Sequence, residues 1–498
     1  MSTVNLHQHQ RVAQLKKDLK NAENYQAWKD IALALDDATG LEAWKYDNAS
    51  DFYGYEFLAQ RLTRLKHLIS SNQQLELTQY LREGLNFDVA NISHPLLYAQ
   101  TYFGTKKLIE DYINTMCKGF LWVLSDGFTL FSTEQKVKYF QDALHAYGQP
   151  ALMFSGGATL GLFHTGVCKA LFEQDLLPKV FSGSSAGSLM TGMLCTHTDS
   201  ELVELLNGEH FYDYAFKFRS IFKILKDRTG IADIQVLKRF LRENLGEYTF
   251  KEAFEKTGRH ASIVVAPYEA GYKPRIMNEL TSPDLLMWSA SLASCAVPLL
   301  FPPVRLTTKR QDGVYSPYME NTRWVDGSVR SDFPLEKMSR LYNINYSIAC
   351  QVNPHIVPFM QSDTARYRND LSSWPSRLLR RQAKNIALEV MDFSRARLNG
   401  VPFVQRLLDH GYGIVDQRYY GDINIHGNYS IKHYIYMLRN PTPKLFKFLQ
   451  SEGEKATWPK ISSIEIHSRI GKSLEYCLDT LMQTNLKNSH SLKKNHVG

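Results

Sequence analysis

The chain has 498 residues, of which 44% are hydrophobic, 12% aromatic and 22% charged. This composition is typical of globular proteins and excludes both a disordered chain and a small disulfide-stapled scaffold. The 58 Lys and Arg residues and the 50 Asp and Glu residues give a formal net charge of +8, which is too mild a bias over this length to indicate nucleic-acid binding.

The first part of the chain is expected to be helical. Residues Met1 to Lys20 are polar and lack the apolar core of a secretory signal. From about Asn24 to Thr115, apolar residues recur at helical spacing with few strand-like runs. We predict a helical N-terminal extension over residues 1–145, for which a packing module is the simplest interpretation.

From Pro150 onward, short apolar runs that end at glycine alternate with helical stretches. This alternation is typical of strand–helix–strand units around a parallel sheet, so we predict an α/β domain over residues 146–357. After Pro358 the chain becomes basic and helical. We expect a C-terminal helical region over residues 358–498, with no regular structure from about Asn485.

The uncharged stretch from Met287 to Val304 is long enough to cross a membrane, but three prolines interrupt it. We therefore expect no integral membrane segment. The six cysteines lie far apart and form no CxxC pair, so neither a disulfide framework nor a zinc site is expected, and a reducing compartment fits best. These features predict a cytoplasmic protein that reaches any lipid from the water side.

A glycine-rich loop opens the predicted α/β domain. The apolar run Ala151 to Phe154 predicts a buried strand, Ser155 to Gly161 form the loop, and a helical run starts at Leu162. Such a loop leaves backbone N–H groups unpaired at the positive end of a helix dipole. The anion that they would bind is either a phosphate or an oxyanion of a transition state. The loop matches neither GxGxxG nor a P-loop.

The next predicted strand, Lys179 to Ser182, leads into the GxSxG motif at Gly183 to Gly187. This motif holds a serine on a sharp strand-to-helix turn, where its neighbours must be small. Because the loop and the motif open consecutive strand–helix turns, both should lie at the carboxyl edge of neighbouring strands, where active sites form. Ser185 is therefore the candidate nucleophile.

A serine hydroxyl also needs a group that takes its proton. Of three Asp-Gly pairs, those at Asp126 and Asp312 have the context of plain turns, whereas Asp326 follows the apolar pair Trp324 and Val325. That context resembles a strand ending at the same edge of the sheet, and an apolar surrounding raises the proton affinity of a carboxylate. Asp326 is therefore the candidate base.

Three blocks, Ser155 to Gly161, Gly183 to Gly187 and Asp326 to Ser328, resemble the signature blocks of the patatin-like phospholipases. The resemblance implies a patatin-like three-layer α/β/α sandwich and a Ser-Asp dyad that needs no histidine. It implies that Ser185 attacks the acyl carbon while Asp326 acts directly as the base. The oxyanion would be stabilised by the backbone amides of Gly156, Gly157 and Ala158.

The chain also resembles one subgroup of this family, the oil-body and lipid-droplet triacylglycerol lipases. The likeness begins in the helical extension, at Trp28, Gly40, Trp44, Gly104, Thr105 and Lys106. It continues at Leu292 to Pro303 and at Ala456 to Lys460. The subgroup implies a lipid acyl hydrolase of the triacylglycerol lipase or phospholipase type that acts in lipid catabolism on long-chain acyl glycerolipids.

Two positions depart from the broader family pattern. Ala158 stands where a third glycine is usual, and Leu160 stands where an Arg or Lys is frequent. Both features occur in the lipase subgroup, so they shift the expected substrate away from anionic phospholipid headgroups and leave the mechanism unchanged. No histidine is followed five residues later by Asp, so transacylation through an HxxxxD motif is not expected.

A lipase must reach an interface, and two segments are candidates for that contact. Arg366 to Arg397 is rich in basic residues and has apolar positions at helical spacing, as in helices on anionic membranes; the alternative is a helix packed on its own domain. Phe211 to Leu225 interleaves aromatic and basic residues, as would a lid or a core helix whose lysines extend to solvent. We expect peripheral association with a membrane or lipid-droplet surface.

Other interpretations remain open. A Ser-His-Asp esterase would use a later histidine, His355 or His410, as its base. A catalytically silent scaffold would keep the fold for lipid docking, and nucleic-acid binding lacks a recognisable module. His164 either lies near the oxyanion or is a packing histidine. No cluster has metal-ligand spacing and no nucleotide fingerprint is present, so we predict no metal and no cofactor.

Overall fold

The chain divides into two units. The helical unit comprises Met1–Gln149, Leu341–Asn345 and Trp458–Gly498, and the sheet unit comprises Pro150–Arg340 and Tyr346–Thr457. The computed structural model describes residues 3–208, 234–269, 273–298, 301–327, 333–354, 420–427, 429, 433, 436–437 and 441–495. The units do not coincide with the predicted ranges 1–145, 146–357 and 358–498, because the last helix crosses from the sheet unit into the helical unit.

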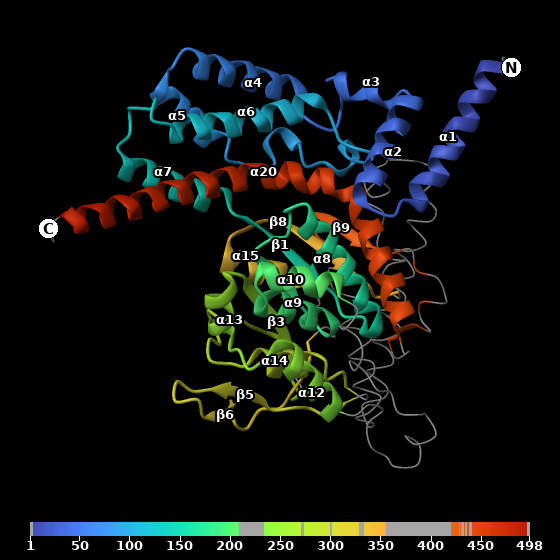
Figure 1. The fold of residues 1–498 in the computed structure, drawn as a ribbon, viewed down its shortest axis with the longest axis vertical. Helices are drawn as coiled ribbons and strands as arrows, with labels where there is room; N and C mark the ends of the chain where they lie inside the picture. The colour runs from blue at the N-terminus through green and yellow to red at the C-terminus, as the bar shows by residue number, and fades with distance from the viewer. Residues whose placement is uncertain are drawn as a thin grey trace, which may run out of the picture. The chain divides into compact units, whose positions relative to one another are not determined.

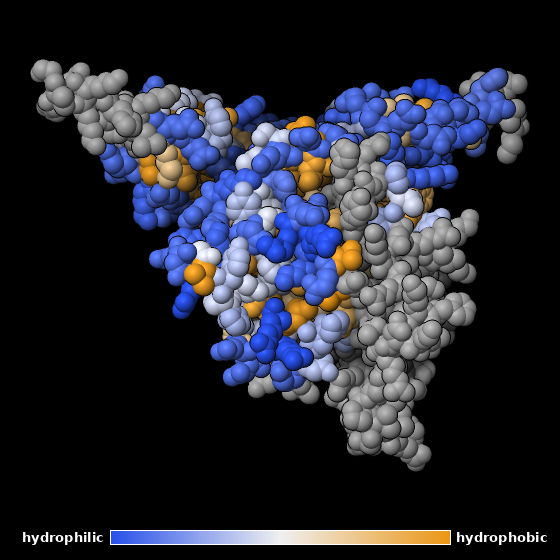
Figure 2. All heavy atoms as spheres, turned by 60° about the horizontal axis from the view of Figure 1, so that its bottom comes forward, coloured by the Kyte–Doolittle hydropathy of each residue, from blue (hydrophilic) through white to orange (hydrophobic). Residues whose placement is uncertain are grey.

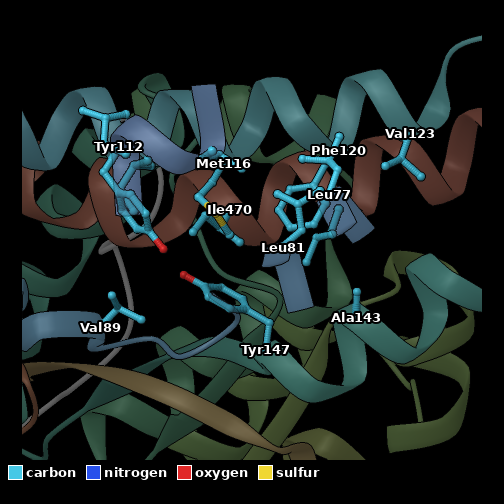
Figure 3. Close-up of a cluster of buried hydrophobic side chains, with 14 of the residues drawn as sticks. Leu77, Leu81, Val89, Tyr112, Met116, Phe120, Val123, Ala143, Tyr147 and Ile470 are labelled. Atoms are coloured by element: carbon cyan, nitrogen blue, oxygen red, sulfur yellow. The ribbon is translucent and has the colours of Figure 1, made fainter. Parts of the chain in front are cut away.

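The helical unit confirms the predicted helical N-terminal region (Figure 1). Its helices are α1 (Thr3–Asn21), α2 (Tyr25–Ala38), α3 (Leu41–Tyr46), α4 (Tyr55–Ser70), α5 (Gln74–Glu83), α6 (Lys107–Leu124), α7 (Thr133–Tyr147) and the second part of α20 (Pro443–Asn495), with the short 3-10 turns η1 (Val89–Asn91) and η2 (Pro95–Leu97). Figure 3 shows side chains from α5, α6, α7 and α20 meeting in one core. A Cβ atom on Gly119 of α6 would lie 2.8 Å from the Leu81 side chain of α5, so this glycine permits close packing of the two helices.

The motif residues of the helical unit hold its loops together. The buried Lys106 amine donates hydrogen bonds to the backbone carbonyls of Trp44 (2.9 Å) and Asp47 (2.6 Å), and it lies 3.8 Å from the centre of the Trp44 ring. The neighbouring Thr105 hydroxyl donates to the carbonyl of Leu97 at 2.7 Å. Within the unit, these residues therefore satisfy buried backbone groups that would otherwise lack partners.

A mixed sheet forms the centre of the sheet unit (Figure 1). Its strands are β1 (Gln149–Phe154), β2 (Val180–Gly183), β3 (His260–Pro267), β4 (Arg275–Met277), β7 (Trp324–Asp326), β8 (Ile344–Gln351) and β9 (Ile423–His426). The order is β4-β3-β2-β1-β8-β9, with β7 also paired to β3. The pairs β1–β2, β2–β3 and β8–β9 are parallel, as predicted, whereas β4 and β7 run antiparallel to β3. Helices lie on both sides of the sheet, which confirms the predicted α/β sandwich.

The short strand β7 brings Asp326 to the sheet. Asp326 pairs with Val265 and Trp324 pairs with Pro267, so β7 meets only the last three residues of β3. From the sequence, this strand is predicted to end at the same edge as the parallel strands. β7 runs in the opposite direction, but Asp326 still lies near that edge. Its partner Val265 is two residues beyond Ile263 of β3, and Ile263 pairs with Gly183, the last residue of β2.

The remaining elements of the sheet unit flank this sheet. They are η3 (Ala158–Leu162), α8 (Phe163–Glu173), α9 (Ala186–Thr196), α10 (Asp199–Asn207), α12 (Ile234–Leu245), α13 (Phe250–Thr257), α14 (Met287–Ser294), α15 (Leu335–Tyr342) and a separate two-stranded hairpin of β5 (Leu306–Lys309) and β6 (Tyr315–Tyr318). The first part of α20 packs on α8 through glycines. A Cβ atom on Gly453 would lie 3.1 Å from the Cα atom of Gly166, and one on Gly166 would lie 2.8 Å from the backbone N of Glu454.

The final helix differs from the expected C-terminal region. α20 runs continuously through Pro459 and continues to Asn495, beyond Asn485, the predicted end of regular structure. Both predicted lipid-contact segments, Phe211 to Leu225 and Arg366 to Arg397, lie outside the described residues. Along the described part of the chain, no helix combines the length and the apolar character needed to cross a bilayer.

Candidate active site

The glycine-rich loop follows β1 and is anchored to the end of β8. The Ser155 backbone N–H donates to the carbonyl of Cys350 (3.0 Å), and the Ser155 hydroxyl oxygen accepts from the backbone N–H of Val352 (2.9 Å). A Cβ atom on Gly157 would collide with the Val352 side chain. Glycine is therefore required at position 157 by close packing against the strand end.

The same loop also touches the turn that carries the candidate nucleophile. A Cβ atom on Gly161 would lie 2.5 Å from the Cβ atom of Ala186, the residue directly after Ser185. Ala158 has a φ of 49°, which is uncommon for a residue with a side chain and is characteristic of constrained functional loops. The structure therefore brings the two predicted motifs together.

Ser185 stands on a sharp turn between β2 and α9, as its GxSxG motif predicts. Its backbone angles are φ 50° and ψ −122°, outside the regions that residues with side chains normally occupy. The turn lies close against the end of β1, since a Cβ atom on Gly187 would lie 2.7 Å from the carbonyl carbon of Phe154. The carbonyl of Ser185 accepts hydrogen bonds from the Ser188 hydroxyl (2.6 Å) and from the Ser188 backbone N–H (2.9 Å).

One short segment contacts both Ser185 and Asp326. It consists of Ser294, Cys295 and Ala296 at the end of α14. The Ser185 backbone N–H donates to the Ser294 hydroxyl oxygen at 2.9 Å, and the Asp326 backbone N–H donates to the Ala296 carbonyl at 3.1 Å. The Asp326 side chain is buried, with 1% of its surface exposed. The candidate nucleophile and base are thus fixed to the same three residues.

The thiol of Cys295 lies within reach of the Asp326 charge. Burial, and after it the negative charge of Asp326, raise the pKa of the Cys295 thiol to about 12. The Cys295 sulfur lies 3.9 Å from the hydroxyl oxygen of Ser188 on α9. The thiol therefore stays protonated and acts as an uncharged neighbour of the carboxylate.

His164 is a buried support for the glycine-rich loop. Its Nε2 atom lies 3.0 Å from the Ser155 carbonyl oxygen, and its Nδ1 atom lies 2.9 Å from the Cys350 sulfur. Because a carbonyl oxygen only accepts, Nε2 carries the proton, and the Cys350 thiol donates to Nδ1. Burial lowers the pKa of His164 to about 4, so the ring is neutral at pH 7. Of the two interpretations of this histidine, the structure supports the packing role.

Ser328, the last residue of the third signature block, and the alternative bases His355 and His410 lie outside the described residues. The sequence motifs do not single out Ser294, although this residue lies in the block Leu292 to Pro303, which resembles the lipase subgroup. Among the described residues, no group of three or more His, Cys, Asp or Glu could hold a metal ion.

A strained serine turn, a glycine-rich loop and a buried carboxylate at neighbouring strand ends together define an α/β serine hydrolase. Residues 152–338 match the patatin-like phospholipase family, and residues 5–145 match a domain of unknown function, DUF3336. With 33% identity to a curated relative over most of both chains, the chain belongs to the patatin-like phospholipase family. The predicted family, fold and enzyme class, a serine-dependent lipid acyl hydrolase, are confirmed.

Three relatives illustrate the extent of the match. Triacylglycerol lipase ptl2 of Schizosaccharomyces pombe is 33% identical over 471 residues, which cover 93% of this chain and 74% of that protein. Triacylglycerol lipase ptl3 of the same organism is 30% identical over 500 residues, covering 96% of this chain and 99% of that protein. Triacylglycerol lipase 5 of Saccharomyces cerevisiae is 30% identical over 490 residues, but the match covers only 63% of that longer protein.

Proposed function

We propose that the protein hydrolyses carboxylic esters of long-chain acyl glycerolipids, with Ser185 as the nucleophile and Asp326 as the base. The observation that carries this proposal is the shared support at the end of α14. The backbone N–H groups of both residues bond to the segment Ser294 to Ala296. A dyad needs its two groups held in one geometry, and a common support of three residues can provide this.

The proposed reaction has two steps. The Ser185 hydroxyl attacks the acyl carbon while its proton passes to the Asp326 carboxylate, and the glycerol oxygen leaves with that proton. This step leaves an acyl group on Ser185. Water then attacks the acyl-enzyme, giving its proton to Asp326, and the fatty acid leaves as the proton returns to Ser185.

The oxyanion formed in each step would be stabilised by the backbone amides of Gly156, Gly157 and Ala158. Two contacts support this assignment. The Gly161 end of the loop lies against Ala186, and the Ser155 end is bonded to β8 through Cys350 and Val352. A loop fixed at both ends keeps its donors oriented before the charge develops, which is the condition for efficient stabilisation.

A neutral glycerolipid is the proposed substrate class. Leu160, at the position where a cation is frequent in the wider family, is buried within the glycine-rich loop. An apolar side chain there offers no counter-charge to an anionic headgroup. The relatives named triacylglycerol lipases support the same class, and a lipid panel distinguishes triacylglycerol from phospholipid.

Contact with a lipid surface forms part of the proposal, and the β5–β6 hairpin is the described element that fits it best. Three of its apolar side chains are exposed: Val314 (52%), Tyr315 (50%) and Met319 (43%). Exposed arginines lie near them in the chain, at Arg305, Arg310 and Arg323, together with two exposed carboxylates, Asp312 and Glu320. Exposed apolar groups with more basic than acidic neighbours suit a membrane or lipid-droplet surface. Figure 2 turns forward the end of the sheet unit that carries β5 and β6, and apolar residues lie there among strongly hydrophilic ones.

The hairpin is also connected to the proposed site. The backbone N–H of Thr307 in β5 donates to the Ser289 hydroxyl of α14 at 2.8 Å, and Val304 pairs with Trp324 of β7. A surface bound at the hairpin would thus lie near the elements that hold Ser185 and Asp326. We propose that the protein is cytoplasmic and associates peripherally with such a surface.

Fatty acid release from triacylglycerol, diacylglycerol, phosphatidylcholine and lysophosphatidylcholine tests the proposal. Wild type should release fatty acid and react with a fluorophosphonate probe, whereas Ser185→Ala should do neither. Ser184→Ala changes the adjacent serine and should still be labelled. Labelling or hydrolysis that persists in Ser185→Ala contradicts the assignment, and lipid binding without release from any of the four lipids would favour the silent scaffold.

A further inference from the structure

Ser294 occupies the last position of α14, within the block Leu292 to Pro303, and its side chain takes no part in the proposed proton transfer. The residue is fully buried. Its hydroxyl oxygen accepts the Ser185 backbone N–H at 2.9 Å and lies 2.8 Å from the Val264 carbonyl oxygen of β3. The first of these bonds joins residues 109 positions apart in the chain.

The direction of both bonds follows from the chemistry of the groups. A backbone N–H only donates, so the Ser294 oxygen accepts from Ser185. A carbonyl oxygen only accepts, so the single hydroxyl proton of Ser294 goes to Val264. The result is a continuous path from the Ser185 amide, through the Ser294 hydroxyl, to the backbone of β3.

The strand reached by this path is the one that holds the candidate base. Val264 precedes Val265, which pairs with Asp326. The next residue, Gly327, lies against the same carbonyl, since a Cβ atom there would be 2.8 Å from the Val264 oxygen. The Ser294 hydroxyl therefore connects the Ser185 backbone to Val264 of β3. Asp326 and Gly327 lie next to this part of β3.

Ser185 needs such an anchor because its backbone conformation is unfavourable. With φ 50° and ψ −122°, the turn persists only if the surrounding contacts over-determine it. The Ser188 hydroxyl of α9 fixes the Ser185 carbonyl. The Ser185 N–H group is fixed by the Ser294 hydroxyl, which belongs to a different helix, α14.

We propose that Ser294 is a positioning residue that sets the separation between the Ser185 hydroxyl and the Asp326 carboxylate. This inference rests on the proposed Ser-Asp reaction. Ser294 contacts the backbone of the nucleophile, and its loss should slow proton transfer and acylation while leaving substrate binding intact. A misplacement of about 1 Å in such a geometry can lower the rate about 100-fold.

The test compares Ser294→Ala with Ser291→Ala in the full chain, using a soluble p-nitrophenyl ester and a fluorophosphonate probe. Ser291 is an equally buried serine on the same helix, and its hydroxyl donates to the Ser188 carbonyl at 3.4 Å. Ser294→Ala should lower kcat and the labelling rate about 100-fold with KM within about twofold of wild type. Ser291→Ala should stay within about threefold of wild type in kcat.

A second pair separates the hydroxyl from side-chain volume. Ser294→Thr keeps the hydroxyl, and Ser294→Val has nearly the same side-chain shape as Thr but carries a methyl group in place of the hydroxyl. If the two variants have equal melting temperatures, Ser294→Thr should have a higher kcat than Ser294→Val. This comparison tests the inference even if Ser294→Ala does not fold. Equal kcat values for Thr and Val, or wild-type kcat in a folded Ser294→Ala, overturn the inference.

The outcomes also separate this inference from the proposed function. If Ser185→Ala remains active, the Ser-Asp reaction itself is wrong, whatever Ser294 does. If Ser185→Ala is inactive while folded Ser294→Ala matches wild type, the reaction stands and only the positioning role of Ser294 is lost.

Discussion

Gly161 and Ala186 meet so closely that the glycine position has no space for a side chain: a Cβ atom on Gly161 would lie 2.5 Å from the Cβ atom of Ala186. Gly161→Ala should displace the glycine-rich loop from Ser185 and lower the fluorophosphonate labelling rate at least about tenfold, because misaligned oxyanion donors lose transition-state stabilisation. The double variant Gly161→Ala/Ala186→Gly removes the colliding atom and should recover part of the rate. Normal labelling of the single variant would contradict the packing described.

Removing the carboxylate of Asp326 should stop the reaction. Asp326→Ala is expected to lower kcat by on the order of 1000-fold, since general-base catalysis contributes about 100-fold to 10,000-fold. Asp312→Ala changes another Asp-Gly pair, in the hairpin turn, and should stay close to wild type. If Asp326→Ala kept its activity while a variant of His355 or His410 lost it, the base would be a histidine.

Acid should destabilise the sheet unit through His164. The pKa of His164 is about 4 in the folded chain, against the ordinary histidine value of 6.5, which applies to the unfolded chain. Between these two pH values the unfolded chain therefore binds the proton more readily than the folded chain. The stabilisation from neutral His164 is complete above pH 6.5 and is lost as the pH falls from 6.5 toward 4. His164→Gln should reduce the drop in unfolding free energy between pH 7 and pH 5 by about 2 kcal/mol. Urea titrations at the two pH values measure this, and identical drops in both proteins would refute it.

Lys106 and its neighbour Lys107 offer a matched pair in the helical unit. Lys106 is fully buried and donates to carbonyls of Trp44 and Asp47, whereas the Lys107 side chain is 39% exposed and pairs with Glu110. Lys106→Met should lower the free energy of unfolding by about 3 kcal/mol, because charged hydrogen bonds are lost and carbonyls are left without donors. Lys107→Met should change it by less than about 1 kcal/mol. Equal effects in chemical denaturation would count against a structural role for Lys106.

The hairpin should contribute to lipid binding. Val314→Glu places a charge at an exposed apolar position and should weaken binding to anionic vesicles about tenfold, through lost apolar contact and charge repulsion. Hydrolysis of a soluble ester should be unchanged. Val203→Glu alters a valine of similar exposure, 50% against 52%, on α10 and serves as the control. A vesicle sedimentation assay that finds the two variants equal would exclude the hairpin from the contact.

Local sequence signals predicted the turns of the site well, because glycine spacing and the GxSxG motif act within a few residues. The predicted runs Ala151 to Phe154 and Lys179 to Ser182 fall on β1 and β2. The direction of β7 was not predictable, because a three-residue strand carries no periodicity that distinguishes parallel from antiparallel pairing. The Ser294 bond was also not predictable, since it joins distant parts of the chain.

The last helix shows why a proline is an uncertain boundary signal. A proline inside a helix usually bends or ends it, because it removes a backbone hydrogen bond. α20 nevertheless passes through Pro459 without ending. Buried side chains on this part of the helix, Ile466, Ile470 and Leu474, join the core of the helical unit, and such packing outweighs local propensity.

The glycine contact between α8 and α20 limits how the enzyme can be shortened. Gly166 and Gly453 let the two backbones approach within side-chain distance, so the helix that follows the glycine-rich loop is covered by residues nearly three hundred positions later in the chain. A recombinant fragment that stops at residue 357 would leave that surface of α8 bare. Expression of a minimal active fragment should therefore retain Pro443 to Thr457, supplied either in the same polypeptide or as a separate peptide.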